Sequence, residues 1–229
     1  MFVLENITKI YHHRQEPVHA LHDISMTIQQ GSFVAITGSS GSGKTTLLLT
    51  LGGLIHPTSG EVNFKGTSLY KRSDNHLAAY RNQTVGFVLQ TFNLVPYLTA
   101  MENVMVPMLA GNHSGNDRRN RAMRLLDKLG LAERTDFLPR ELSIGQQQRV
   151  AIARALANDP EVILADEPTG NLDPVLSFEI LDILRELNEK EGRTVLMVTH
   201  NPEAAREAKR ILQLKDGRLC KKTVMSYNS

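Results

Sequence analysis

The chain has 229 residues, of which 41% are hydrophobic and 22% are charged, a composition typical of a globular domain that buries a core without disulfide bridges. Its 26 basic and 24 acidic residues leave a formal charge of +2, so the overall charge indicates neither a nucleic-acid partner nor an acidic membrane surface. The single cysteine, Cys220, excludes an internal disulfide and fits a reducing cytoplasm.

Targeting and membrane-spanning segments are not expected. The first six residues carry no basic side chain and reach Glu5 before an apolar run develops, which argues against a signal peptide. No apolar stretch approaches the roughly 20 residues that a helix needs to cross a bilayer. We therefore expect a cytoplasmic chain and, if it serves a membrane, a separate chain that spans it.

The first half of the chain is dominated by predicted strands. They lie at about residues 2–10, 24–28, 33–37, 62–64 and 85–89. Ile24, Met26 and Ile28 alternate with polar residues, as a half-buried strand does. A leucine-rich helix is expected after the glycines that follow residue 37.

Between about residues 98 and 139 the pattern changes to helical spacing. Met101, Met105 and Met108 recur with this spacing, and we expect them to fill the interior of a helical lobe rather than to form a docking surface. A polar loop is expected over residues 111–116.

Strand and helix signals then alternate to the end of the chain. Strands are predicted at residues 162–165, 194–199 and 211–214, helices at 176–187 and near 204, and a turn at 216–217. Such alternation with continuously apolar strands predicts a mostly parallel sheet covered on both faces, and the early alternating strands predict an antiparallel β subdomain. The expected fold is a single α/β domain over residues 1–229. Its core comprises residues 1–90 and 159–229, and an inserted α-helical subdomain comprises about residues 91–158.

A glycine-rich segment after the predicted strand 33–37 fits the pattern G-x-x-x-x-G-K-[ST], the phosphate-binding P-loop. It consists of Gly38, Ser39, Ser40, Gly41, Ser42, Gly43, Lys44, Thr45 and Thr46. Glycines let the backbone fold around a phosphate chain with its N–H groups pointing inward, and the helix that follows adds its positive end. Lys44 is expected to reach the terminal phosphates, and the Thr45 hydroxyl is expected to bind Mg²⁺. The core is therefore interpreted as that of a P-loop NTPase.

Two acids, Asp166 and Glu167, directly follow the apolar strand 162–165, at the end where ligands of parallel sheets bind. Asp166 is expected to hold Mg²⁺ through water, and Glu167 is expected to polarise the attacking water as general base. Without the phosphate loop, the same two acids would more simply be surface charges.

Further motifs resemble those of the ATPase subunits of ABC transporters, in the order that this family has them. Residues 142–149, which include Ser143, Gly145 and Gln146, resemble the signature motif. Gln90 falls at the end of a strand, where the family has its Q-loop, and His200 follows the strand 194–199, as the switch histidine does.

The D-loop is resembled by residues 171–173, which end at Asp173, and Tyr11 falls where an aromatic ring stacks on adenine. The resemblance covers about residues 2–219 of the chain. Taken singly, Gln90 could be a polar cap, His200 a residue that starts a helix, and Tyr11 a packing residue.

The resemblance implies a role for each motif. In this family the signature residues, here Ser143, Gly145 and Gln146, face the terminal phosphate of the ATP that the other subunit's P-loop holds. Two ATP molecules are then enclosed in a head-to-tail homodimer. Gln90 would contact Mg²⁺ and the attacking water, and would also sense a membrane partner. His200 would hydrogen-bond the γ-phosphate as a catalytic residue, and Asp173 would cross the dimer boundary.

The chain departs from the family pattern at Ile144, where glycine is usual. A branched side chain excludes a positive φ and narrows close approach. We expect the site to function, at a turnover rate that Ile144 alters.

Residues 93–96, 98–104 and 167–173 resemble the branch that contains macrolide exporters, lipoprotein-releasing systems and a cell-division pair. In that branch the ATPase lies at the inner face of the membrane beneath an integral-membrane permease, to which its ATP-driven closure is transmitted. We expect residues 92–95 to form part of the groove that receives a permease helix. Importers share parts of these segments.

Three alternatives remain open: an importer ATPase, a regulatory ABC ATPase of a cell-division or similar complex, and a chromosome- or repair-type ABC ATPase. The intact Glu167 and His200 argue against a purely regulatory module. The third class carries long coiled coils between its nucleotide motifs, and no sustained heptads appear here. Nucleic acid is therefore not an expected partner.

Overall fold

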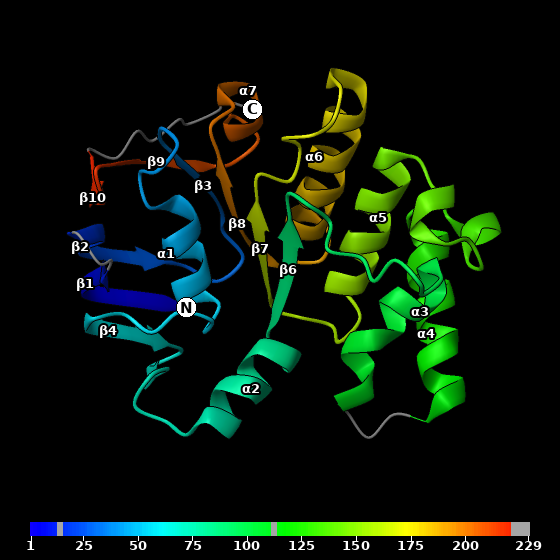
Figure 1. The fold of residues 1–229 in the computed structure, drawn as a ribbon, viewed down its shortest axis with the longest axis horizontal. Helices are drawn as coiled ribbons and strands as arrows, with labels where there is room; N and C mark the ends of the chain where they lie inside the picture. The colour runs from blue at the N-terminus through cyan, green and yellow to red at the C-terminus, as the bar shows by residue number, and fades with distance from the viewer. Residues whose placement is uncertain (13–15, 111–113, 221–229) are drawn as a thin grey trace.

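The computed structural model describes residues 1–12, 16–110 and 114–220 (Figure 1). The strands are β1 (Phe2–His12), β2 (Pro17–Ile28), β3 (Phe33–Thr37), β4 (Ser59–Phe64), β5 (Thr67–Ser68), β6 (Val85–Leu89), β7 (Val162–Asp166), β8 (Thr194–Thr199), β9 (Arg210–Lys215) and β10 (Arg218–Leu219). The α-helices are α1 (Lys44–Leu51), α2 (Asp74–Gln83), α3 (Ala100–Met105), α4 (Gly115–Lys128), α5 (Ile144–Ala155), α6 (Pro174–Glu189) and α7 (Pro202–Ala205). Short 3₁₀ helices are η1 (Val106–Ala110), η2 (Ala132–Arg134) and η3 (Pro139–Glu141).

The early strands form an antiparallel sheet in the order β2-β1-β4-β5. β1 pairs with both β2 and β4 in antiparallel register, with irregularities that begin at Leu4 and Glu5. Phe2, Leu4 and Ile7 are buried on one face of β1, while Val3 is exposed. The alternating pattern of the sequence therefore reflects one covered face, and the predicted antiparallel subdomain is confirmed.

A second sheet of six strands, in the order β10-β9-β3-β8-β7-β6, forms the centre of the molecule (Figure 1). β3 lies parallel to both β8 and β9, and β7 lies parallel to both β6 and β8. Only the short pairing of β10 with β9 is antiparallel within this sheet. The mostly parallel core is thus confirmed, and the carboxyl ends of β3, β6, β7 and β8 meet at one edge.

Two hydrophobic cores cover the two faces of the parallel sheet. In β3, Phe33 and Ala35 join the core with α5 and α6, while Val34 and Ile36 join the core with α1 and the antiparallel sheet. Central strands are continuously apolar because both of their faces are buried. This sandwich fixes the β3–α1 connection, where the phosphate loop lies, between the two sheets.

The described residues between β6 and β7 form helices and contain no strand. Met101 and Met108 are buried, and Met105 is partly buried against the same core, so the prediction that these methionines are interior is confirmed. Residues 111–113 of the predicted polar loop lie outside the described residues. Ser114 is outside the helix as its N-cap, as predicted, but the prediction is wrong for residues 115–116, because α4 begins at Gly115.

Some elements were not predicted. Helix α2 and the short strand β5 fill the connection between β4 and β6, where the sequence pattern is weakly apolar. Leu77 and Tyr80 of α2 are nevertheless buried beneath the antiparallel sheet. In the part of the chain that the structure describes, no helix combines the length and apolar character that a bilayer crossing requires.

Candidate functional site

The loop between β3 and α1 is fastened to two other strands at its glycines. A Cβ on Gly38 would lie 2.2 Å from the carbonyl oxygen of Leu214 in β9, and a Cβ on Gly43 would lie 2.1 Å from that of Ala20 in β2. Gly43 also has a φ of 100°, which side-chain-bearing residues rarely adopt. Any larger residue would collide with backbone, so the tight loop depends on glycine at both positions.

Lys44 opens α1 and is buried, with only 7% of its surface exposed. Its Nζ donates hydrogen bonds to the carbonyl oxygens of Gly38, at 2.9 Å, and Ser39, at 3.0 Å. An ammonium group has three donors, so these two bonds hold the charge over the loop and leave a donor for a phosphate oxygen. The arrangement is a cradle for an anion.

Thr45 and Asp166 bring α1 and the end of β7 together. The Thr45 hydroxyl donates to Oδ1 of Asp166 across 3.1 Å. Burial raises the pKa of Asp166, and the hydrogen bond from Thr45 opposes that rise.

A hydroxyl and a carboxylate so placed are the hard oxygen ligands that Mg²⁺ takes, with waters and substrate phosphates completing its shell. Among the described residues, no group of three or more His, Cys, Asp or Glu could hold a metal by itself. The residues present therefore fit a magnesium ion that arrives with a nucleotide.

Glu167 and His200 form a second polar pair. The Glu167 carboxylate accepts the backbone N–H of His200 at 3.2 Å, and its Oε1 lies 2.9 Å from Nδ1 of His200. Glu167 has a left-handed φ of 46° and donates its N–H to the carbonyl of Val198 in β8. Such a conformation in a long side-chain residue persists only where surrounding structure holds it, and it is common at functional sites. The carboxylate is thereby held against His200, with each of its two oxygens in contact with that residue.

Gln90 is the first residue after β6 and packs against the turn that follows Glu167. The backbone carbonyl of Gln90 accepts a hydrogen bond from Nδ2 of Asn171 at 3.1 Å. A Cβ on Gly170 would lie 2.9 Å from the side-chain nitrogen, Nε2, of Gln90. The end of β6 and the turn after β7 are therefore in direct contact.

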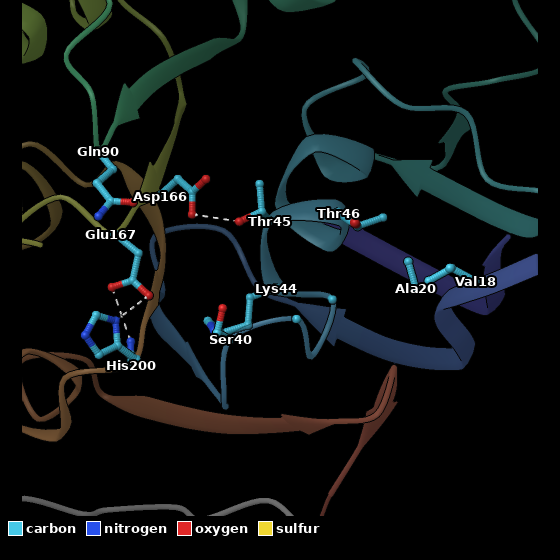
Figure 2. A pocket seen from close by; sticks show the side chains of 12 residues that line it. Val18, Ala20, Ser40, Lys44, Thr45, Thr46, Gln90, Asp166, Glu167 and His200 are labelled. Carbon is cyan, nitrogen blue, oxygen red and sulfur yellow. Dashed lines mark hydrogen bonds and ion pairs between the residues drawn. The ribbon is translucent and has the colours of Figure 1, made fainter. Parts of the chain in front are cut away.

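One cavity of about 530 Å³ collects these side chains (Figure 2). Figure 2 shows Gln90, Glu167 and His200 along one side, with Lys44 and Thr45 at the start of α1 facing them. The predicted residues in its lining are Gly41, Gly43, Lys44, Thr45, Thr46, Gln90, Asp166, Glu167 and His200, and the lining also includes Val18, Ala20 and Ser40.

Val18 and Ala20 were missed because nothing in the local sequence marks them. They reach the cavity through the pairing of β2 with β1, in which Val18 lies opposite Tyr11. Tyr11 itself is not part of the described lining, and Nζ of Lys9 lies 5.2 Å from the centroid of its ring. The placement of Tyr11 on an adenine ring stays a prediction.

Three predicted loop residues do not line this cavity. Gly38 and Ser39 line a separate cavity of about 530 Å³ against α7. Ser42 is buried at 3% exposure, and its backbone carbonyl accepts the N–H of Gly217 at 3.1 Å. The structure therefore does not bring these three residues into the cavity with the other predicted residues.

The signature residues lie away from this cavity, at the tip of α5. The Ser143 hydroxyl accepts the N–H of Gln146 at 3.3 Å, and Oε1 of Gln146 accepts the N–H of Ser143 at 2.9 Å, which forms a capping box. Asp173 caps α6 without a capping box, through its Oδ1, which accepts the N–H groups of Val175 and Leu176. Ser143 and Asp173 are both exposed.

Ile144 does not need a positive φ, because it is the first residue of α5 and has a helical backbone. Its side chain is 52% exposed beside Ser143. Gly145 is buried, and a Cβ there would lie 2.9 Å from the Leu176 side chain on α6. The backbone strain considered at Ile144 is therefore absent, and only the bulk of its side chain can affect the approach of another group.

Two side chains on α5 that the sequence analysis did not single out make long-range contacts. Arg154 donates to the carbonyls of Phe92, at 2.6 Å, and Asn93, at 2.5 Å, two consecutive residues with positive φ. Gln148 donates to the carbonyl of Pro168 at 2.7 Å. Neither bond leaves a signal in the local sequence, because its partners are distant in the chain.

Known proteins with similar sequences and structures indicate the same family as the sequence motifs. The family model described as ABC transporter matches residues 21–170. The ABC transporter ATP-binding protein YvrO of Bacillus subtilis is 48% identical over 219 residues, which cover 96% of this chain and 95% of YvrO. The macrolide export ATP-binding/permease protein MacB of Syntrophobacter fumaroxidans is 48% identical over 216 residues, which cover 93% of this chain but 30% of MacB.

A solved structure of the ATP-binding cassette MJ0796 is also similar, with a TM-score of 0.92, 44% identity and 100% coverage of both chains. It is described as a dimeric post-hydrolysis state bound to ADP and Pi. With a family match over residues 21–170 and relatives that align over nearly its whole length, this chain belongs to the ABC transporter family, as an ATP-binding cassette ATPase.

Proposed function

We propose that this chain binds Mg²⁺-ATP in the cavity beside α1 and hydrolyses it. The observation that carries the proposal is that one cavity joins the Lys44 cradle, the Thr45–Asp166 oxygen pair and the Glu167–His200 pair. Lys44 and the loop N–H groups bind the phosphates, and Thr45 and Asp166 would hold Mg²⁺, which would neutralise phosphate charge. Gln90 orients the attacking water.

Glu167 acts as general base and accepts a proton from that water, while His200 holds the Glu167 carboxylate and the γ-phosphate. The contact between Glu167 and His200 supports these roles, because a base must be held in place before a water can lie against it. Apo hydrogen bonds of this kind rearrange when substrate binds.

The chain is proposed to act as a homodimer around two ATP molecules. Ser143, Gly145, Gln146 and Asp173 lie outside the cavity lining of their own protomer, and the Ser143 tip is exposed. A second copy that presents this tip to the cavity would close it from the opposite side. The dimeric MJ0796 cassette supports this arrangement.

We further propose an integral-membrane permease as partner, with the chain at the inner face of the membrane and an export or mechanotransmission role. MacB, which is an ATP-binding/permease protein in one chain, supports the pairing of such a cassette with a permease. The proposed docking region is the segment 92–95 together with a cavity of about 180 Å³ between β6, η1 and α5, lined in part by Arg154 and Asn158. In this proposal residues 91–158 move as a helical subdomain against the core of residues 1–90 and 159–229.

The proposal is tested by Mg²⁺-dependent ATPase measurements on the purified chain, with and without double-stranded DNA and with a permease encoded beside it. A transporter ATPase hydrolyses ATP at a rate that DNA leaves unchanged and that the permease changes. Stimulation by DNA would instead support the chromosome- or repair-type alternative, and ATP binding without hydrolysis would support a regulatory module. Direction of transport in reconstituted vesicles separates exporter from importer.

A further inference from the structure

Gln148 is a buried polar residue inside α5 that the proposed chemistry does not use. It has 0% exposure, and its amide nitrogen donates to the carbonyl of Pro168 at 2.7 Å. Because a carbonyl only accepts, this partner requires the nitrogen of the amide to face it. The other amide atom, Oε1, is buried without a hydrogen-bond partner in the described part of the chain. Since an unpaired buried oxygen lowers stability, packing alone does not account for a glutamine here.

The acceptor belongs to the turn that carries the general base. Pro168 directly follows Glu167 and has no N–H, so its carbonyl is the hydrogen-bonding group of that residue. The turn is closed by the N–H of Gly170, which donates to the carbonyl of Glu167 at 3.0 Å. Gln148 therefore hydrogen-bonds to the turn after β7, and the Glu167 side chain at the start of this turn lines the cavity.

The N-terminus of the same helix carries the signature tip. Gln148 lies five residues after Ser143, about 7 Å along a regular helix axis. Gly145 is one turn before Gln148 and is buried against α6. A short, rigid helical segment thus separates the exposed Ser143 tip from the Pro168 carbonyl.

In the proposed homodimer, on which this inference rests, the Ser143 tip and the turn that Gln148 contacts belong to different ATP sites. Glu167 acts on the nucleotide held by its own protomer, whereas the Ser143 tip faces the nucleotide held by the partner. We propose that Gln148 is a positioning residue that couples the two sites: engagement of the tip by one nucleotide shifts α5, and the Gln148–Pro168 bond places Glu167 for the other. Coupling of this kind requires a contact that differs between the engaged and free states of the tip.

The test compares Gln148→Met with Asn188→Leu. Methionine is unbranched and of similar length, so it fills the space without donating a hydrogen bond. Asn188→Leu is a matched control, because Asn188 is also a buried amide within a helix. It donates to the carbonyls of Gly31, at 2.9 Å, and Arg193, at 2.7 Å, and does not line the cavity. ATPase rates are measured against ATP concentration at excess Mg²⁺, and each rate is divided by the amount of protein that binds nucleotide, so that unfolded chains do not count.

For Gln148→Met we expect kcat to fall about ten-fold and the Hill coefficient to fall from near 2 towards 1. The affinity of the single protomer for ATP, measured at protein concentrations too low for dimers, should stay within about two-fold of the parent, because the coupling affects only steps that need both sites. Asn188→Leu should match the parent in kcat, Hill coefficient and affinity.

The inference is overturned if Gln148→Met keeps the parent's kcat and Hill coefficient, or if Asn188→Leu loses both to the same extent, since either result removes any special role for the Pro168 bond. It is also overturned if kcat falls while the Hill coefficient is unchanged. Failure of the proposed function gives a different result, because the parent itself would then show neither Mg²⁺-dependent hydrolysis nor a Hill coefficient above 1.

Discussion

The β3–α1 loop and the tip of α5 each lead into a helix N-terminus that is predicted to contact phosphate, yet the surroundings of the two differ in the structure. Around the loop, Lys44, Thr45 and Glu167 face one another across a cavity within a single chain. At the tip, Ser143 and Gln146 satisfy each other's backbone groups, and the surface beyond them is open. A capping box keeps a helix N-terminus stable in water until a ligand reaches it.

This difference teaches which measurements should respond to each region. A change in the loop should be visible in one isolated protomer, because the residues proposed to hold the phosphates all lie within a single chain. A change at the tip should leave that binding intact and affect only steps that require a second copy. The following substitutions test this division.

Glu167→Gln should have the largest effect. The amide cannot accept the proton of water, so turnover should fall by about 10² to 10⁴, while ATP binding persists and dimers accumulate. Phosphate release and light scattering with ATP and Mg²⁺ measure both effects. Glu133→Gln, an exposed acid in η2, makes the same charge change away from the cavity. Equal turnover by Glu167→Gln and the parent would remove the general-base assignment.

Lys44→Ala should come next. Loss of a charged donor to the phosphates should weaken ATP affinity of the single protomer by about 100-fold, as measured by calorimetry. Lys215→Ala, on the exposed end of β9, removes the same charge and should leave affinity unchanged. Unaltered ATP binding by Lys44→Ala would contradict the cradle.

Ser143→Ala should separate the two regions most clearly. Its hydroxyl is proposed to contact the partner's nucleotide, so turnover should fall about ten-fold with single-protomer affinity unchanged. Loss of the cap should also lower stability by about 1 kcal/mol. Ser114→Ala is the control, because Ser114 caps α4 through the N–H of Asp117 and its loss should lower stability without changing turnover. If Ser143→Ala lowered single-protomer affinity instead, the tip would belong to its own cavity.

Ile144→Gly should have the smallest effect. The Ile144 side chain is half exposed at the tip, so its removal should ease approach of the second copy and raise turnover without altering single-protomer affinity. Glycine should also lower stability by about 0.5 kcal/mol. Ile144→Ala removes the bulk without glycine's flexibility, and thermal melts together with ATPase rates distinguish the two effects. Lower turnover in both variants would show that the bulk helps rather than hinders.

Much of the fold was predictable because its signals are local. The alternation at Ile24, Met26 and Ile28 predicted a sheet with one covered face, and the continuous apolar run at residues 33–37 predicted a strand buried on both. Helix α2 was missed because Leu77 and Tyr80 are too few to produce a strong period, although both are buried. The start of α4 was misjudged because Ser114 and Gly115 resemble loop residues until Ser114 is seen as a cap.

The candidate site divides in the same way. The sequence by itself determined the P-loop, the acids after β7 and the motifs that carry the family resemblance, because each depends on the spacing of neighbouring residues. Only the tertiary structure decided that Val18 lines the cavity, that Glu167 is held by His200, and that Gln148 reaches Pro168. These contacts join strands and helices that are distant in the chain, and it is the packing of two sheets around β3 and α1 that brings them together.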